Sequence, residues 1–597
     1  MRGFYLQEVR SAPDYRVPHV DAAYHDYWAR ALAFGYQAPP RDDPDPELRT
    51  TPYFRPPGYP FLLAAIYKVA GPDPIGPRVV QMVVGLLNVL LGWVLARQVC
   101  GRGAALVTAS WLGTYWIFPY FEGELQEPAF STFFLLGLLH VLWRWQRRQR
   151  VGWILAAGIV VGLLALIRPN ALLLIPVLWG WLAWIQRSDA RLRSRLVGQG
   201  LAMGLAATVV IAPVTIRNWV VGHQLVPISA NGGINLYIGN NADADGTVRG
   251  ETPYGVLDTC YDWPGIVKTM EMELGRPVDY QGASREFSRM ALDFILAHPD
   301  QALRLAVRKT IYYWGPSEPG DNREVSIERK LSPSLRANPW DFGMTLALAI
   351  CGVMLFVRER RRSGRRTDAR SARERRGLAN ETWQAGMLWL AVALLWWVSY
   401  LPFAAGSRYR VPTIPILFLF GGWFAVRFGW MVLSRQARTS AAWAVTLLGL
   451  IVACHVNLIQ PGSSYARWHY QRAMSYWELG DKEAALQEYQ TAASCNPKNP
   501  AVQNDLGVAL ASLGRIDEAI PHFQRALERN RKSPAAHFNL GTAYESKQWY
   551  GEAASEYRAA LQLDPGHVGA RDGLERVRRL SAGVSRSVGT GSAASPS

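Results

Sequence analysis

Long apolar runs without charge most constrain what this chain can fold into. Residues 79–96 (VVQMVVGLLNVLLGWVLA) and 196–216 (LVGQGLAMGLAATVVIAPVTI) contain no charged residue. A helix of about 20 apolar residues crosses a hydrocarbon core of roughly 30 Å, and its backbone polar groups are satisfied within the helix. A buried core helix is the alternative interpretation, but many such runs in one chain favour a membrane protein.

Ten runs of adequate length predict membrane-spanning helices. They lie near residues 78–97, 103–119, 128–144, 151–167, 170–185, 196–216, 341–357, 384–403, 411–429 and 441–459. Basic loops follow the odd-numbered runs, and positively charged loops stay on the cytoplasmic side of a membrane. The alternation therefore places residues 1–77, the loop 217–340 and everything after residue 460 on the outer face.

The formal charge of +17 arises largely from Arg-rich segments between these runs. They are RWQRRQR (144–150), QRSDARLRSR (186–195) and RERRRSGRRTDARSARERR (358–376). The charge is thus a signal of topology rather than of nucleic-acid binding, with attraction to anionic lipid head groups as a secondary interpretation. The abundance of Arg favours a GC-rich bacterial genome, and hence a bacterial inner (plasma) membrane.

The first residues, MRGFYLQEVRSAPDYRVP, contain no signal peptide or apolar span that could export them. Because the topology places this N-terminal segment outside, we expect that the sequence as given lacks a first transmembrane helix. An in-frame apolar segment upstream in the gene would confirm this expectation.

The loop 217–340 is too long for a simple connector. Its section SANGGINLYIGNNADADGTVRG (229–249) is rich in residues that favour turns, and helical patterns follow over residues 284–314. We therefore expect a folded outer subdomain.

The C-terminal part contains an internal repeat of 34 residues, the period of tetratricopeptide repeats. Positions that recur at this step are Ala473, Gly507 and Gly541; Ala485, Ala519 and Ala553; Tyr489, Phe523 and Tyr557; and Ala492, Ala526 and Ala560. Small residues let paired helices approach, and the aromatic residue fills the gap between them. Residues 463–580 are thus predicted to form three such repeats, followed by a Ser/Gly-rich, disordered tail at 581–597.

Candidate chemical groups lie at the ends of the predicted spans on the outer side. Asp21, Tyr24 and Trp28 are at helical spacing, although Asp21 at a helix start is also a favoured N-cap residue. The other charged candidates are Arg55, Glu122, Glu124, Glu127, Arg168, Arg217, Arg408 and Arg410. Such residues often serve only as interfacial anchors, but acidic and basic groups gathered on one side of a bundle indicate a site.

Five motifs in this order resemble the GT-C superfamily of glycosyltransferases over roughly residues 15–430. They are VDAAYHDYWARALAFG (20–35), YFRPPGYP (53–60), GELQEP (123–128), IRP (167–169) and RNWVVGHQLVPISANGGINLYIGNN (217–241). The branch with the most similar motifs is glycosyltransferase family 39, with protein-mannosyltransferase-like and lipid-A aminoarabinose-transferase-like members. Some members of that group also carry appended repeats.

The resemblance implies transfer of a sugar from a polyprenyl phosphate to an acceptor on the outer face. Asp21 matches the family's general base or acceptor-orienting carboxylate, and Arg55 matches its phosphate-binding residue, where some members have Lys. Glu127 is the better match to the second acidic position, with Glu124 as the alternative. Arg217, Arg408 and Arg410 are further expected to bind the donor phosphate. Possible substrate-binding positions are Tyr24, Glu124, Arg168 and Asn240.

The predicted fold is accordingly an all-α polytopic membrane protein of the GT-C type, with an extracytoplasmic loop subdomain and a C-terminal α-solenoid. The expected parts are 1–77 (first outer loop with juxtamembrane helices), 78–216 (transmembrane), 217–340 (loop subdomain), 341–459 (transmembrane), 463–580 (repeats) and 581–597 (tail). No cofactor is expected, and a divalent metal is not indicated. The expected partners are the polyprenyl-phosphate sugar, the bilayer and a protein or glycan acceptor, but no nucleic acid.

Two other functions fit parts of the pattern. A non-catalytic membrane scaffold would display the repeats and would not need Asp21. The second is a flippase or a ligase of lipid-linked oligosaccharides. A flippase, as a transporter, would be expected to carry ionisable residues near mid-membrane, whereas the charges here lie mainly at span ends.

Overall fold

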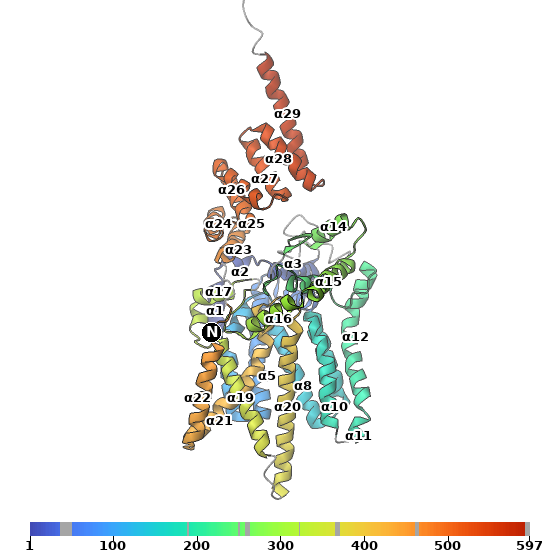
Figure 1. Cartoon of the computed structure of the whole chain (residues 1–597), viewed down its shortest axis with the longest axis vertical. Coiled ribbons are helices and arrows are strands. Elements are labelled where there is room, and N and C mark those ends of the chain that lie inside the picture. The colour runs from blue at the N-terminus through green and yellow to red at the C-terminus, as the bar shows by residue number, and fades with distance from the viewer. Residues whose placement is uncertain are drawn as a thin grey trace, which may run out of the picture. The chain divides into compact units, whose positions relative to one another are not determined.

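The computed structural model describes residues 1–35, 51–187, 190–248, 251–256, 263–320, 323–363, 370–459 and 465–590. The chain divides into two compact units, each of them helical (Figure 1). One unit comprises Met1–Ser11 and Pro18–Ser463, and the other Ala12–Val17 and Ser464–Ser597. We refer to them as the membrane unit and the repeat unit.

Within the described residues, seven helical segments of the membrane unit are long and apolar enough to cross a bilayer. They are formed by α5 (Ile75–Val99), η1 with α10 (Pro169–Leu173, Leu174–Gln186), α12 (Leu196–Gly222), α19 (Phe342–Ser363), α20 (Arg370–Tyr400), η3, η4 and α21 (Ser407–Tyr409, Val411–Thr413, Ile414–Leu433), and α22 (Ala437–Cys454). The three remaining predicted positions hold α6 (Arg102–Thr114), α8 (Pro128–Arg148) and α9 (Val151–Ile167). A helix therefore occupies each of the ten predicted runs.

The ends of α8 and α19, where two of the Arg-rich segments begin, lie together at one end of these helices. Arg147, at the end of α8, forms an ion pair of 2.5 Å with Glu381 of α20. Arg360, near the end of α19, donates a hydrogen bond to Asn380 of the same α20. The ends of α8 and α19 therefore meet the same part of α20, as expected for helices that alternate in direction.

Glycine determines how closely two of the helices pack. A Cβ atom on Gly158 of α9 would lie 2.3 Å from the carbonyl oxygen of Met203 in α12, and one on Gly162 would lie 2.9 Å from that of Ala207. The backbones of α9 and α12 can approach this far only because these positions have no side chain. Such small-residue contacts are typical of helix packing in membranes, where apolar burial supplies little driving force.

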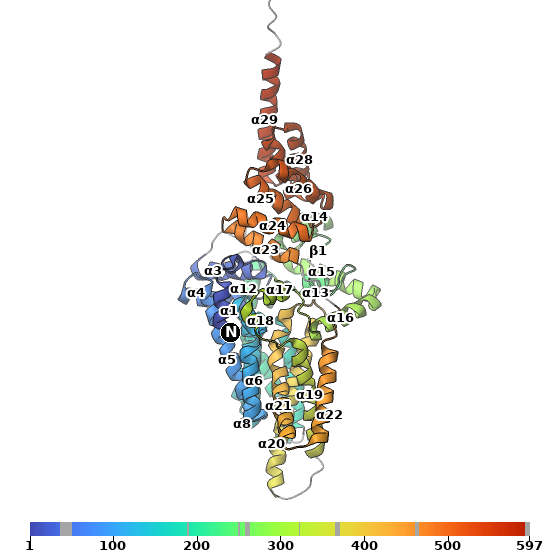
Figure 2. The same ribbon diagram turned by 90° about the vertical axis from the view of Figure 1, so that its left-hand side faces the viewer.

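The opposite end of the bundle carries short helices and loops (Figures 1 and 2). From the N-terminal part come α1 (Arg2–Val9), α3 (Asp21–Phe34), α4 (Gly58–Ala70) and α7 (Ile117–Gly123). From the long loop come α13 (Gly232–Gly239), the antiparallel pair β1 (Glu251–Thr252) and β2 (Gly255–Val256), α14 (Trp263–Leu274), α15 (Tyr280–Ala297), α16 (Pro299–Trp314), α17 (Val325–Leu331) and α18 (Pro333–Arg336). The four-residue α11 (Ala190–Arg193) connects α10 to α12 at the Arg-rich end.

The repeat unit contains three helix pairs and a final long helix. They are α23 (Tyr465–Glu478) with α24 (Lys482–Cys495), α25 (Pro500–Ser512) with α26 (Ile516–Arg529), α27 (Pro534–Ser546) with α28 (Tyr550–Leu563), and α29 (Val568–Thr590). A Cβ atom on Gly507 would lie 2.6 Å from the Phe523 ring, and one on Gly541 would lie 2.9 Å from the Tyr557 ring. The aromatic residue thus fills the space beside the glycine, as the repeat pattern predicts.

Two boundaries differ from those expected. The N-terminal segment 12–17, which contains α2 (Pro13–Arg16), packs on α23 and belongs to the repeat unit rather than to the first outer loop. Its Pro13, Asp14 and Tyr15 are buried there, which the polar sequence does not reveal. The helix α29 continues through residues 581–590, the first part of the expected tail, and the rest of that tail, residues 591–597, lies outside the described residues.

Candidate active site

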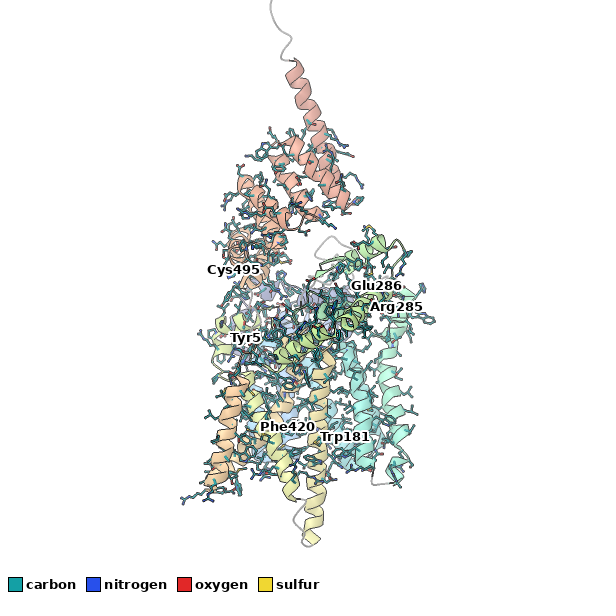
Figure 3. The ribbon with its side chains drawn as sticks, viewed as in Figure 1. Tyr5, Trp181, Arg285, Glu286, Phe420 and Cys495 are labelled. Atoms are coloured by element: carbon teal, nitrogen blue, oxygen red, sulfur yellow. The ribbon has the colours of Figure 1, made fainter. Side chains whose placement is uncertain are left out.

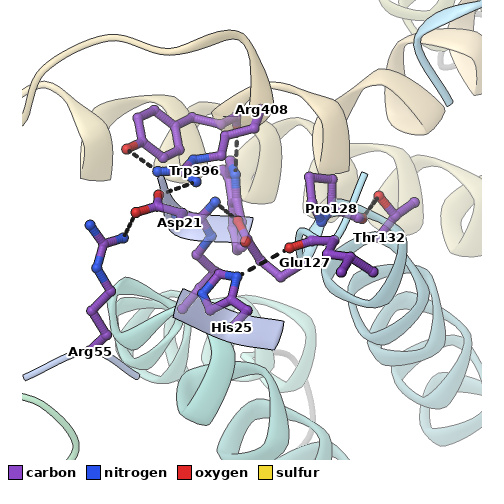
Figure 4. A network of polar contacts seen from close by, with 11 residues as sticks. Asp21, His25, Arg55, Glu127, Pro128, Thr132, Trp396 and Arg408 are labelled. Carbon is purple, nitrogen blue, oxygen red and sulfur yellow. Dashed lines mark hydrogen bonds and ion pairs between the residues drawn. The ribbon is translucent and has the colours of Figure 1, made fainter. Parts of the chain in front are cut away.

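The carboxylate of Asp21 lies between two guanidinium groups. Asp21 is the first residue of α3 and is 2% exposed. Its Oδ1 lies 2.6 Å from Nη1 of Arg55, and its Oδ2 lies 2.8 Å from Nη1 of Arg408 (Figure 4). The N-cap position of α3 is Val20, so Asp21 is not the cap of this helix. Its side chain instead forms the two ion pairs.

Local structure explains how these three residues meet. Val20 adopts a positive φ of 55°, which turns the chain sharply before α3. Arg55 precedes the two prolines that lead into α4, and Arg408 lies in the short helix η3 before α21. At Gly58 a Cβ atom would lie 2.7 Å from the carbonyl carbon of Leu166, so glycine lets the start of α4 touch the end of α9.

A second ion pair forms between Glu127 and Arg168. Glu127 precedes Pro128 at the start of α8, and Arg168 follows the last residue of α9. Both side chains are largely buried. The GELQEP and IRP motifs therefore contact each other.

The Tyr409 ring connects the two ion pairs. The guanidinium carbon of Arg168 lies 4.9 Å from the ring centre, and that of Arg408 lies 5.2 Å from it. Tyr409 stacks on Tyr400 at 4.6 Å, and its carbonyl accepts a hydrogen bond from the indole of Trp396. The two carboxylates and three guanidinium groups thus form one cluster with an excess of positive charge.

His25 belongs to this cluster and was not predicted from the sequence. It lies one helical turn after Asp21, and its Nδ1 is 3.2 Å from the carbonyl oxygen of Leu125. Burial lowers the pKa of His25 to about 4, although the Asp21 charge acts in the opposite direction. The imidazole is therefore neutral at pH 7. Its spacing of four residues from Asp21 was the only signal in the sequence.

The three glutamates in and beside the acidic turn before α8 pair with different arginines. Glu127 joins the cluster, whereas Glu124 forms an ion pair of 2.6 Å with Arg323. Glu122 pairs with both Nε and Nη2 of Arg2, at 2.6 and 2.8 Å. Of the two alternatives for the second acidic position, the structure brings Glu127 to Arg168.

Arg410 points away from its near neighbour Arg408. It is 1% exposed, donates to the carbonyl groups of Tyr313 and Gly315, and pairs with Glu318 at 2.6 Å. These contacts hold the chain after α16 against the start of α21.

The remaining predicted residues have other surroundings. Arg217 donates to the Thr51 carbonyl and lies over the Tyr53 ring, with its guanidinium carbon 3.9 Å from the ring centre. Asn240 donates to the Pro402 carbonyl and accepts a hydrogen bond from Lys309.

Tyr24 is buried on α3, with its ring 5.5 Å from that of Trp28. It therefore lies in the helix that carries Asp21 and His25.

No group of three or more His, Cys, Asp or Glu side chains within the described parts of the chain is arranged to hold a metal ion. The cluster around Asp21 is built instead from guanidinium groups. Arginine forks bind phosphate oxygens through two parallel hydrogen bonds, so the excess positive charge suits a phosphate group.

Residues 54–216 match the family model of dolichyl-phosphate-mannose-protein mannosyltransferases. The match supports a membrane glycosyltransferase of the GT-C type. It covers Arg55, Glu127 and Arg168, while Asp21 and Arg408 lie outside the matched residues. A search of curated proteins finds no match.

The repeat unit matches a tetratricopeptide repeat model at residues 470–534 and 504–568. Solved structures similar to it include the first TPR domain of Spaghetti (RPAP3) bound to an HSP90 peptide, which is 23% identical in sequence. That match covers 20% of this chain and 96% of the solved chain, with a TM-score of 0.20. The TPR protein YrrB is 22% identical; the match covers 26% of this chain and 74% of the YrrB chain, with a TM-score of 0.19. MamA has 18% identity, with coverage of 25% and 79% and a TM-score of 0.19.

Proposed function

We propose that this membrane glycosyltransferase transfers a sugar from a polyprenyl-phosphate donor to an acceptor on the extracytoplasmic face. The observation that carries the proposal is the buried Asp21 carboxylate between Arg55 and Arg408, at one end of the membrane helices. A donor with a prenyl chain can stay in the bilayer while its phosphate reaches this cluster. We place the enzyme with the protein-mannosyltransferase-like and aminoarabinose-transferase-like enzymes of family 39.

The two arginines have different access to a donor. The Arg55 side chain is 22% exposed, whereas that of Arg408 is 9% exposed. We therefore assign the first contact with the donor phosphate to Arg55. Arg408 then stabilises the charge that develops on the phosphate as it leaves.

Asp21 acts as the base in this proposal. An acceptor hydroxyl oxygen attacks the anomeric carbon, and its proton passes to an Asp21 carboxylate oxygen. The bond between the anomeric carbon and the phosphate oxygen breaks, and its electron pair stays on the phosphate. Glu127, held by Arg168, orients the sugar or the acceptor beside the reacting centre.

We infer the orientation in the membrane from the charges. The Arg-rich ends of α8 and α19 lie at the end of the bundle opposite to Asp21, and such loops stay in the cytoplasm. This supports an outer location for Asp21 and for the chain after α22, and so for the repeats. Stacked repeats of this kind form a concave helical surface, which is suited to holding a protein acceptor or partner.

The test is transfer of a labelled sugar from polyprenyl phosphate in membranes that contain wild type, Asp21→Asn or Arg55→Ala. We expect each substitution to lower turnover about 100-fold, because a preorganised charged group at the reacting centre typically contributes that much. Asp26→Asn is the matched control: Asp26 is also a buried acid of α3, but it pairs with Arg30 and Tyr67.

Equal turnover in all four proteins would remove the catalytic interpretation. A scaffold that displays the repeats would then be favoured, and deletion of residues 463–580 would abolish the phenotype while Asp21→Asn would not. Equal levels of folded protein in the membrane, measured by fluorescence-detected gel filtration, are required for the comparison.

A further inference from the structure

Helix α16 lies where the membrane-spanning helices end. On its buried face, Nζ of Lys309 lies 3.0 Å from the carbonyl oxygen of Leu401, directly after α20. The hydroxyl of Tyr313 lies 3.1 Å from that of Thr413, at the start of α21. Since α20 and α21 cross the bilayer, a helix fixed to these ends lies at the level of the lipid head groups.

The opposite face of α16 is both apolar and basic. Leu303 and Val307 are 66% and 51% exposed, and Arg304 and Arg308 are exposed beside them. Residues four apart lie on the same side of a helix, so the four side chains form two adjacent stripes. Apolar and cationic stripes on one helix are typical of segments at the membrane interface.

A cavity of about 560 Å³ lies against these stripes. Phe294 of α15, Val307 and Ile311 of α16, and Ile459 after α22 give it an apolar wall. Arg304 and Arg308 also line it. The cavity thus offers hydrocarbon contact and positive charge next to the end of a membrane helix.

The positive charge is available to a ligand. Within the part of the chain that the structure describes, Arg308 has neither a hydrogen bond nor an ion pair. Arg304 pairs with Asp300 of the same helix at 2.6 Å, but both side chains are well exposed. Such exposed pairs contribute little free energy, so a phosphate group can compete for Arg304.

We propose that this cavity binds one anionic phospholipid of the surrounding bilayer. Its phosphate contacts Arg308 and Arg304, and one acyl chain lies along Val307, Ile311 and Ile459. The site is separate from the Asp21 cluster, and its existence does not depend on the proposed transferase function. The bound lipid would hold α16 in place, and with it the turn after Leu401 that leads to Arg408.

The experiment is native mass spectrometry of the full-length protein in detergent, titrated separately with phosphatidylglycerol, phosphatidylcholine and undecaprenyl phosphate. We expect one phosphatidylglycerol to bind in preference to phosphatidylcholine. Arg308→Gln should weaken that binding about fivefold, since one basic residue near a lipid surface contributes about 1 kcal/mol. Arg285→Gln is the matched control, because Arg285 is exposed on α15 but does not line the cavity (Figure 3).

Three results would overturn the proposal. The first is equal binding of phosphatidylglycerol to wild type and Arg308→Gln, and the second is equal binding of phosphatidylglycerol and phosphatidylcholine to wild type. The third is undecaprenyl phosphate binding more tightly than phosphatidylglycerol and losing that advantage in Arg308→Gln, which would make the cavity a groove for the carrier lipid. Unchanged thermal unfolding of Arg308→Gln will show that the variant is folded.

Discussion

At the scale of single residues, the double pairing of Asp21 allows a charged ligand to enter a buried site. Removing one partner of a buried ion pair usually costs several kcal/mol, because the other charge is left uncompensated. In the proposed reaction a donor phosphate draws Arg55 away while Arg408 still pairs with Asp21. The cluster therefore accommodates exchange of partners without leaving a lone buried carboxylate.

Arg408 and Arg410 provide a direct test, because they are two residues apart and have opposite surroundings. We expect Arg408→Ala to lower turnover about 100-fold with little change in thermal stability, because Asp21 keeps Arg55 as a partner. Arg410→Ala should instead lower the free energy of unfolding by about 3–5 kcal/mol, because it leaves Glu318 buried and unpaired.

The measurements are sugar transfer and the thermal unfolding midpoint of both purified variants. The assignment fails if Arg410→Ala keeps wild-type stability but loses turnover, since Arg410 would then be the residue that contacts the donor. Arg408→Lys is a useful companion, because it retains the charge but cannot form the planar two-pronged contact.

Motif order in the sequence pointed to Asp21, Arg55 and Glu127, and the structure brings these three residues into one cluster of ion pairs. It could not identify the partners Arg2 and Arg323, because ion pairs across more than 100 residues depend on tertiary packing. Nor does local sequence distinguish Arg408 from Arg410. Which way each side chain turns depends on α16 and α3, which are distant in the chain.

At the scale of elements, the Arg2–Glu122 pair fastens α1 to α7, next to the turn that supplies Glu127. Arg2 also donates to the carbonyl of Gly113, at the end of α6. Burial raises the pKa of Glu122 to about 7, and the Arg2 charge opposes that rise. This contact is therefore sensitive to pH near neutrality.

The sign of the effect on stability follows from proton linkage. An exposed glutamate in the unfolded chain has a pKa of about 4.5, so between pH 4.5 and 7 the folded state binds the proton more tightly. The free energy of unfolding should therefore fall as pH rises through this range and level off above it. In Glu122→Gln this contribution is absent, and the stability of the variant relative to wild type should increase from pH 5 to pH 7.

Thermal unfolding midpoints of the detergent-solubilised proteins at half-unit pH steps provide the measurement. The slope of the difference is the quantity to compare, since the absolute values also include the loss of the pairing with Arg2. Parallel curves for wild type and Glu122→Gln would contradict the raised pKa.

Elements themselves were the most predictable part of the molecule. Hydrophobic length located a helix at each of the ten runs, and the 34-residue step located the aromatic residues that fill the repeats, as at Phe523. The packing of α2 on α23 was not predictable: α2 has only four residues, too few for a periodic pattern, and its partner begins more than 440 residues later.

At the scale of the whole molecule, the orientation of the chain decides where the chemistry takes place. Helices that alternate in direction bring the start of α19 and the end of α22 together, where His455 lies 2.8 Å from Asp341. Arg410 contacts the ring of Phe342, the first residue of α19. The chain after α22 therefore leaves the membrane on the face that carries the candidate active site.

Cys495 offers a test of this orientation, because it is exposed at the end of α24 (Figure 3). A variant that keeps Cys495 and replaces the other four cysteines should react with a membrane-impermeant maleimide in intact bacterial spheroplasts. Arg150→Cys in a cysteine-free chain is the control, since it places an exposed thiol at the Arg-rich end. That thiol should react only after permeabilisation. Reaction of Arg150→Cys in intact spheroplasts, with protection of Cys495, would reverse the orientation and place the proposed transfer in the cytoplasm.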